Sequence, residues 1–78
     1  MNKRELEQKL INENIDSNSY WLEGGLPNEA HCLGKNGDVW EVYYSERGRK
    51  TKLKTFTAEE EACAYFYAWI VKTMKGMG

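Results

Sequence analysis

The stretch Val39-Trp40-Glu41-Val42-Tyr43-Tyr44-Ser45-Glu46 decides the fold, because it is a dense run of β-branched and aromatic residues. Asn36-Gly37 lies just before it and Arg47-Gly48 closes it. A run of this kind between two short turn signals predicts the middle strand of an antiparallel meander. The two turns fix the register of the neighbouring strands, and register decides which side chains enter the core and which face a partner.

Asn36 and Gly37 are predicted to be the central residues of a type I′ turn, since both tolerate the positive φ that this turn requires. The expected cross-strand pairs are Lys35–Asp38, Leu33–Trp40, His31–Val42, Glu29–Tyr44, Cys32–Glu41 and Ala30–Tyr43.

The turn at Arg47-Gly48 sets the register of the next strand. A loop of two or four residues places Leu53 opposite Val42 and Lys54 opposite Glu41, whereas a loop of three residues turns the wrong side inward. We therefore expect the even loop. One face then carries Leu33, Trp40, Val42, Tyr44 and Leu53. The other carries Glu41, Tyr43, Lys50, Lys52 and Lys54, with Glu41 and Lys54 paired across the strands.

The N-terminal segment predicts a helix and a further strand. Asn2 is a suitable N-cap for a helix that ends near residue 14, with Leu6 and Leu10 on its buried side. A short strand is expected over residues 19–23. Gly24-Gly25-Leu26-Pro27-Asn28 then forms a loop, because paired glycines and a proline resist strand pairing.

The C-terminal segment predicts a second helix. Thr57 at the N-cap and Glu60 three residues later form a capping box, and the helix continues to about Lys75. Gly76 and Gly78 are expected to end it. The inward positions of this helix are Ala62, Phe66, Trp69, Ile70 and Thr73.

Together these elements predict an α+β fold in one domain, residues 1–78. It is a four-stranded antiparallel meander flanked by an N-terminal and a C-terminal helix (α-β-β-β-β-α). The C-terminal helix covers one face of the sheet, and the other face stays open. We expect Trp40, Val42, Leu53, Phe66 and Trp69 to belong to the core.

Composition limits the possible classes of function. With 78 residues, 41% hydrophobic residues and a net charge of −1, the chain folds around one small core and shows no overall basic footprint for nucleic acid. No apolar run reaches the roughly 18 residues of a membrane span, and the N-terminus lacks the apolar core of a signal peptide. We expect a cytoplasmic protein.

The residues that could carry chemistry are isolated. His31 is the only histidine, and Cys32 and Cys63 belong to no CxxC motif. Both thiols are expected to be buried or half-exposed, and His31 to lie in the core or at its edge. The side chains of Glu59, Glu60 and Glu61 point in different directions on a helix, so they cannot converge on one atom. Their negative charge in the first turn is favoured by the helix dipole. We therefore expect no enzymatic activity, no cofactor and no metal.

Two surface features suggest binding. Lys50, Lys52 and Lys54 alternate along one strand beside Tyr43, which is compatible with a small nucleic-acid patch. A solvated face that resists aggregation is the favoured explanation, because Glu41 pairs into the same face. An aromatic residue beside charges on an open face is also a common protein-interface composition, although ordinary sheet packing explains it equally well.

The sequence also resembles a known family. Gly24-Gly25-Leu26-Pro27-Asn28, Lys35-Asn36-Gly37, the run from Trp40 through Tyr-Tyr-Ser-Glu-Arg-Gly, and Phe56 before Glu59-Glu60-Glu61-Ala62-Cys63 are similar to small immunity proteins of bacterial polymorphic toxin systems. Those systems act in contact-dependent competition between bacteria. The similarity covers roughly residues 19–70.

The resemblance implies a stoichiometric inhibitor that binds the toxin domain of its own system in the cytoplasm. The toxins of such systems are often nucleases, and Glu29, Asp38, Glu41 and Glu46 would then mimic phosphate against a basic cleft. The alternative is a nucleic-acid-binding module that uses the Lys50/Lys52/Lys54 face. The oligomeric state and the toxin's activity stay open. The expected partner contacts are Glu41, Tyr43, Glu46, Arg47, Arg49 and Lys52.

Overall fold

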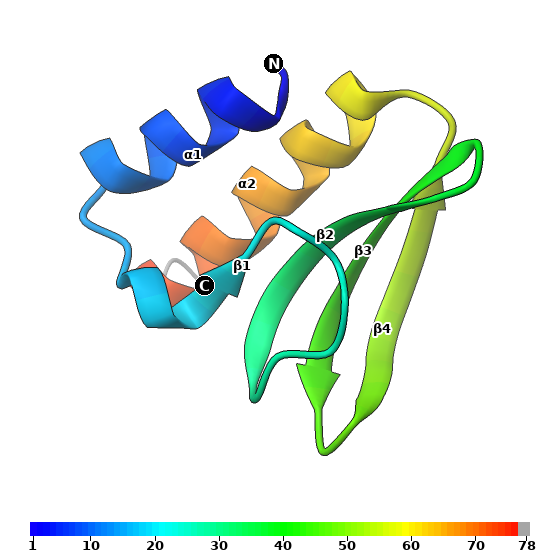
Figure 1. Ribbon diagram of the computed structural model, residues 1–78. Coiled ribbons are helices and arrows are strands. Elements are labelled where there is room, and N and C mark those ends of the chain that lie inside the picture. The colour runs from blue at the N-terminus through cyan, green and yellow to red at the C-terminus, as the bar shows by residue number, and fades with distance from the viewer. Residues whose placement is uncertain (77–78) are drawn as a thin grey trace.

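The computed structural model describes residues 1–76 and has an α+β fold. The elements are α1 (Lys3–Asn12), a 3-10 turn η1 (Ser17–Ser19), β1 (Tyr20–Trp21), β2 (Ala30–Asn36), β3 (Val39–Glu46), β4 (Arg49–Phe56) and α2 (Glu59–Lys75). The four strands form one sheet in the order β1-β2-β3-β4. The two expected helices and four strands are therefore present (Figure 1).

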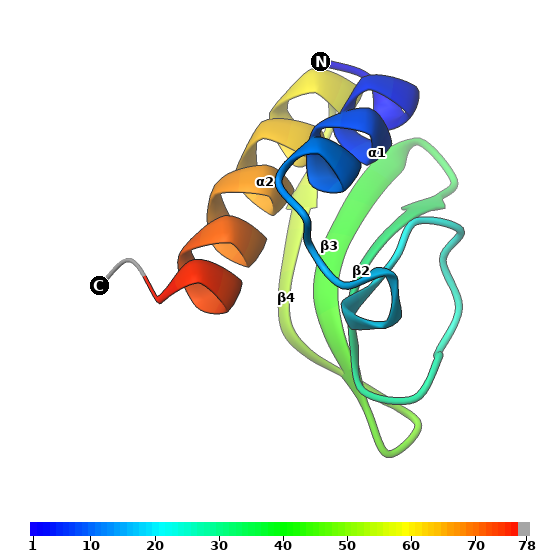
Figure 2. The same cartoon turned by 90° about the vertical axis from the view of Figure 1, so that its left-hand side faces the viewer.

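The expectation of a purely antiparallel sheet is wrong, because β1 pairs with β2 in parallel. A parallel pair needs a connection that crosses over the sheet rather than a tight turn. Residues 23–29, here called the strap, make that crossing. The strap lies on one side of the sheet and α2 lies on the other (Figure 2).

The turn between β2 and β3 is displaced from the expected position. Gly37 and Asp38 are its central residues, with Asn36 paired to Val39, and only Gly37 has a positive φ, of 63°. A type I′ turn at Asn36-Gly37 would need a positive φ at both residues. The register is therefore shifted by two residues, which keeps every side chain on its expected face. Leu33 now lies opposite Val42, and both are fully buried.

The two-residue turn between β3 and β4 is confirmed at Arg47-Gly48, which have φ values of 51° and 75°. The register beyond it is not the expected one. Between the pairs Tyr44↔Thr51 and Val42↔Lys54, β4 has one residue more than β3, which is a β-bulge. Lys54, rather than Leu53, lies opposite Val42.

α1 begins as the sequence predicts. The Asn2 side chain accepts a hydrogen bond from the Glu5 backbone, and the Glu5 carboxylate accepts one from the Asn2 backbone. Leu6 and Leu10 are fully buried in the main core, and the helix ends at Asn12, two residues earlier than expected.

The capping box expected at Thr57 and Glu60 is absent, because Ala58 is the N-cap of α2 and makes no side-chain capping bond. Instead, the Glu59 carboxylate accepts a hydrogen bond of 2.9 Å from the Lys3 backbone N–H in the first turn of α1. The two helices run side by side in the same direction (Figures 1 and 2). This carboxylate therefore lies beside both positive helix ends, where negative charge is favoured.

α2 ends as expected near Lys75, with Gly76 in the left-handed conformation at φ 67°. Gly78 lies outside the described residues. The main core joins both helices to the inner face of the sheet. Its buried members are Leu6, Leu10, Ile15, Leu22, Leu33, Val42, Ala62, Cys63, Phe66 and Ile70. Trp40 and Trp69 pack against this core but are only partly buried, and the expected inward position of Thr73 is exposed.

Candidate protein-binding surface

The sheet face expected to be open is covered by the strap. Tyr43 is only 1% exposed, and its hydroxyl donates a hydrogen bond of 2.6 Å to the Gly25 carbonyl. Ser45, which is fully buried, donates to the Pro27 carbonyl. Burial raises the pKa of Tyr43 to about 12, so the hydroxyl stays protonated and keeps its donor role. Tyr43 is a structural residue here, and its expected exposure to a partner is wrong.

A glycine pair permits this close approach of strap and sheet. A Cβ at Gly34, in β2, would lie 2.8 Å from the Gly24 Cα. No side chain larger than hydrogen fits between the two backbones. Glycine inside a strand often marks such a contact, so Gly34 is the residue in the sequence that signals the strap.

Glu41 also lies on the covered face, and only 8% of it is exposed. Its carboxylate accepts a hydrogen bond of 2.8 Å from the Lys50 ammonium, not from Lys54 as expected. The bond from Lys50 lowers the pKa of Glu41, with a smaller contribution from the Asn36 amide. Glu41 is therefore already paired within the chain.

The four carboxylates expected to mimic phosphate do not form one cluster. Glu41 is buried and paired, and Asp38 lies in the turn between β2 and β3. Glu29, which directly precedes β2, and Glu46, the last residue of β3, lie near Tyr44 at the end of the sheet opposite that turn. The arrangement offers no single acidic surface to a basic cleft.

Three of the residues expected to contact a partner lie at the turn between β3 and β4. Glu46, Arg47 and Arg49 are all exposed, and Glu46 lies opposite Arg49 across the turn. None of the three forms an ion pair within the described part of the chain. Their charged groups are therefore available to another molecule.

The bulge in β4 divides the expected lysine row. Lys50 lies opposite Ser45 on the strap side, whereas Lys54 lies opposite Val42 on the helix side. Lys52, in the bulge, has a φ of 55°, which a non-glycine residue seldom adopts. Leu53 follows it and is 46% exposed, so its expected place in the core is wrong.

A row of aromatic rings lies between α2 and the sheet. Phe56 contacts Tyr65 with centroids 5.4 Å apart, and Tyr65 is followed by Trp69 at 6.4 Å. His31 continues the row at 4.4 Å from Trp69, and Tyr44 lies 5.1 Å beyond it. Tyr65 is 37% exposed, whereas His31 is buried. The row is therefore exposed at Tyr65 and buried at His31.

The single histidine and the two cysteines are buried. Burial lowers the pKa of His31, whose Nδ1 lies 3.3 Å from the Ser19 carbonyl oxygen. Burial raises the pKa of both Cys32 and Cys63 to about 11, so both are protonated thiols at neutral pH. Cys32 packs with Tyr43 under the strap and Cys63 packs in the main core, on opposite sides of the sheet.

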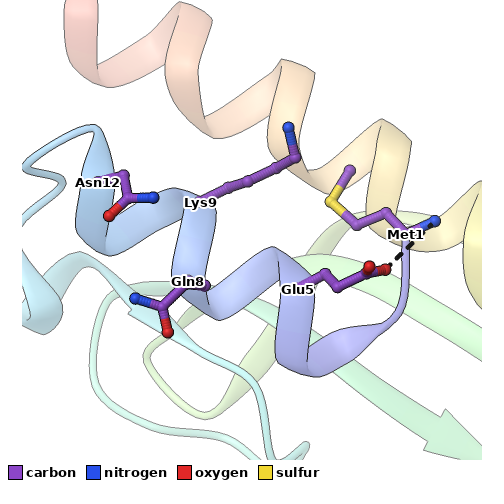
Figure 3. Close-up of a pocket in the computed structure, with 5 residues that line it drawn as sticks. All are labelled: Met1, Glu5, Gln8, Lys9 and Asn12. Atoms are coloured by element: carbon purple, nitrogen blue, oxygen red, sulfur yellow. Dashed lines mark ion pairs between the residues drawn. The ribbon is translucent and has the colours of Figure 1, made fainter.

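A hollow of about 440 Å³ lies along α1, lined by Met1, Glu5, Gln8, Lys9 and Asn12 (Figure 3). Its one carboxylate, on Glu5, lies 3.9 Å from the Met1 amino group. The lining holds no thiol, hydroxyl or imidazole that could act as a nucleophile or general base.

Within residues 1–76, no three His, Cys, Asp or Glu side chains are grouped so as to hold a metal ion. Over the same residues, no helix has the length and apolar character that a membrane crossing requires.

No protein-family model, curated protein or solved structure matches this chain. The exposed residues of β4, the turn before it and the aromatic row form the candidate protein-binding surface.

Proposed function

We propose that this protein is an immunity protein, which binds and neutralises a cognate bacterial toxin domain as a stoichiometric inhibitor. The observation that carries the proposal is the exposed outer strand β4, with the charged turn at one end and the aromatic row beside it. Arginine and aromatic side chains are enriched at protein-binding surfaces, and both are exposed or half-exposed here. The resemblance of residues 19–70 to immunity proteins supplies the class of partner.

Inhibition by such a protein needs neither turnover nor a cofactor. It acts in the cytoplasm, where the toxin would otherwise damage its own cell. Of the expected contacts, Glu46, Arg47, Arg49 and Lys52 are the ones we assign to the partner surface, because all four are exposed. Glu41 and Tyr43 support that surface from within the sheet.

The test is co-expression with the C-terminal domain encoded by the gene directly upstream. The wild-type chain is expected to restore growth and to copurify with that domain. The double variant Arg47→Glu/Arg49→Glu should lose protection and keep the wild-type thermal midpoint, since both side chains are exposed.

The matched control for this pair is Arg4→Glu/Lys9→Glu on α1, which changes the net charge equally and should protect normally. Equal protection by the two double variants would refute the assigned surface. Failure of the wild-type chain to bind that domain would refute the function.

The alternative, a nucleic-acid-binding module, has less support because the bulge places Lys50 and Lys54 on different faces. Retention on single-stranded DNA or RNA that falls steeply with salt would favour it. No salt-dependent retention is expected under the immunity proposal.

A further inference from the structure

The net charge of the chain is close to zero, but its positive and negative charges are strongly separated along the sequence. Residues 47–54 hold five of the eleven Lys and Arg and none of the twelve Asp and Glu, so their formal charge is +5. The net charge of the chain is −1, so the remaining residues together carry −6. The basic segment is the turn before β4 together with most of β4 itself.

This basic segment lies along a free edge of the sheet. β4 is the last strand in the order β1-β2-β3-β4 and pairs only with β3 among the described residues. Six of its eight residues are exposed, and the other two, Thr51 and Phe56, are half-buried. Within residues 1–76, Lys50 is the one of these five cations that forms an ion pair, and its partner is Glu41. The edge therefore presents unpaired positive charge and unpaired backbone groups together.

The bulge adds an apolar contact to this edge. Without it, Leu53 would lie opposite Val42, whose side chain is fully buried in the main core. The unusual positive φ of Lys52 instead leaves Leu53 46% exposed. β-bulges and sparsely populated backbone conformations are enriched at sheet edges and functional sites, where they re-aim a side chain. Phe56 and Tyr65 extend the apolar character at the far end of the strand.

These observations distinguish between the molecules that could bind along the free edge of β4. A second copy of the chain would place five cations against five, which like-charge repulsion disfavours. Nucleic acid would match the +5 segment but not the exposed Leu53, and it would be repelled by the −6 carried elsewhere. An extended segment rich in Asp and Glu matches the charge, the free edge and the apolar contact.

We propose that β4 binds an acidic, extended segment of a partner protein, which lies along its outer edge. This deepens the proposed function, on which the identity of the partner as a toxin domain rests. The resemblance implied that acidic side chains of this chain face a basic cleft of the partner. The proposal is the reverse, because basic side chains of this chain face an acidic segment of the partner.

The test uses a probe that does not depend on the toxin. A short peptide of alternating Glu and Thr, about as long as β4, is titrated into the isotopically labelled chain and followed by amide NMR shifts. The matched probes are the same peptide with Gln in place of Glu, and an oligo-dT strand of equal charge. Shifts are expected in β4 and its turn with the Glu peptide and not with the Gln peptide.

Three variants locate the contact. Lys52→Glu/Lys54→Glu should weaken the Glu peptide about tenfold or more, whereas Arg4→Glu/Lys9→Glu should leave it unchanged. Leu53→Ser should weaken binding with no change in thermal midpoint, because the side chain is exposed. Absence of shifts in β4, tighter binding of oligo-dT at the same amides, or concentration-dependent dimerisation through β4 would each overturn the proposal.

A failure of the immunity function and a failure of the acidic-segment inference would give different results. A chain that binds the acidic peptide on β4 but does not protect against the upstream-encoded domain contradicts the immunity function only. A chain that protects against that domain through the turn but does not bind the Glu peptide contradicts the acidic-segment inference only.

Discussion

Replacing Tyr43 tests whether the strap covers the sheet. Tyr43 is 1% exposed and its hydroxyl donates to the Gly25 carbonyl at 2.6 Å. Tyr43→Phe removes only that bond and should cost about 1 kcal/mol. For a domain of this size, that loss lowers the thermal midpoint by about 4–8 °C. Tyr43→Ala also removes the ring, and removal of a buried aromatic ring costs about 3–5 kcal/mol.

The assay is thermal and urea unfolding followed by circular dichroism, with Tyr44→Phe as the matched control. Tyr44 is the neighbouring tyrosine and is only half-buried, and its hydroxyl makes no hydrogen bond within the described residues. The loss from Tyr43→Ala equals the lower end of the stability expected for such a chain, about 4–12 kcal/mol. An unchanged midpoint in Tyr43→Ala would refute the covered face and leave Tyr43 free to contact a partner. Equal midpoints for Tyr43→Phe and Tyr44→Phe would refute the hydrogen bond.

Three further predictions concern stability. Gly34→Ala should destabilise the chain by about 1–3 kcal/mol in urea unfolding, because its Cβ would lie 2.8 Å from the Gly24 Cα; wild-type stability would contradict this contact. Burial lowers the pKa of His31, so the unfolded chain takes up this proton first and stability should fall as the pH drops below about 6.5. His31→Phe should abolish this decline in midpoints measured from pH 7 to 5, and an unaltered profile would count against it. Lys50 lowers the pKa of Glu41, so this pair stabilises above the unfolded carboxyl pKa and is lost as the pH falls through the folded one. Lys50→Met should therefore destabilise the chain by only about 1 kcal/mol at neutral pH, because the Lys50 side chain is 36% exposed and solvent screens the pair. The destabilisation should be smaller in acid, and a difference in stability that stays constant across pH would exclude the pair.

The sequence predicted the elements because local patterns determine them. Asn2 followed by Glu5 specified the start of α1, and Arg47-Gly48 specified the turn between β3 and β4. The displaced turn at Gly37 left every face unchanged, since a shift of two residues preserves the alternation of a strand.

The candidate surface was harder to predict because it depends on two non-local or irregular features. The strap covers Tyr43 by crossing from β1 to β2, and only Gly34 signals this contact in the sequence. The bulge at Lys52 has no sequence signal, since no glycine marks it, and it moved Leu53 from the expected core to the surface. Arg47 in the turn and Arg49 at the start of β4 are exposed, as the turn chemistry predicts, and their contact with a partner stays a prediction.

The strap also affects how the molecule opens. It is attached to the sheet by two side-chain hydrogen bonds, one backbone hydrogen bond from the Gly24 N–H to the Leu33 carbonyl and the contact of two glycines, whereas the helices share a buried core of ten residues with the sheet. The free energy of local opening is lowest where buried apolar contacts are fewest. Brief detachment of the strap therefore uncovers Cys32 while Cys63 stays enclosed, so alkylating reagents should modify these two thiols at different rates.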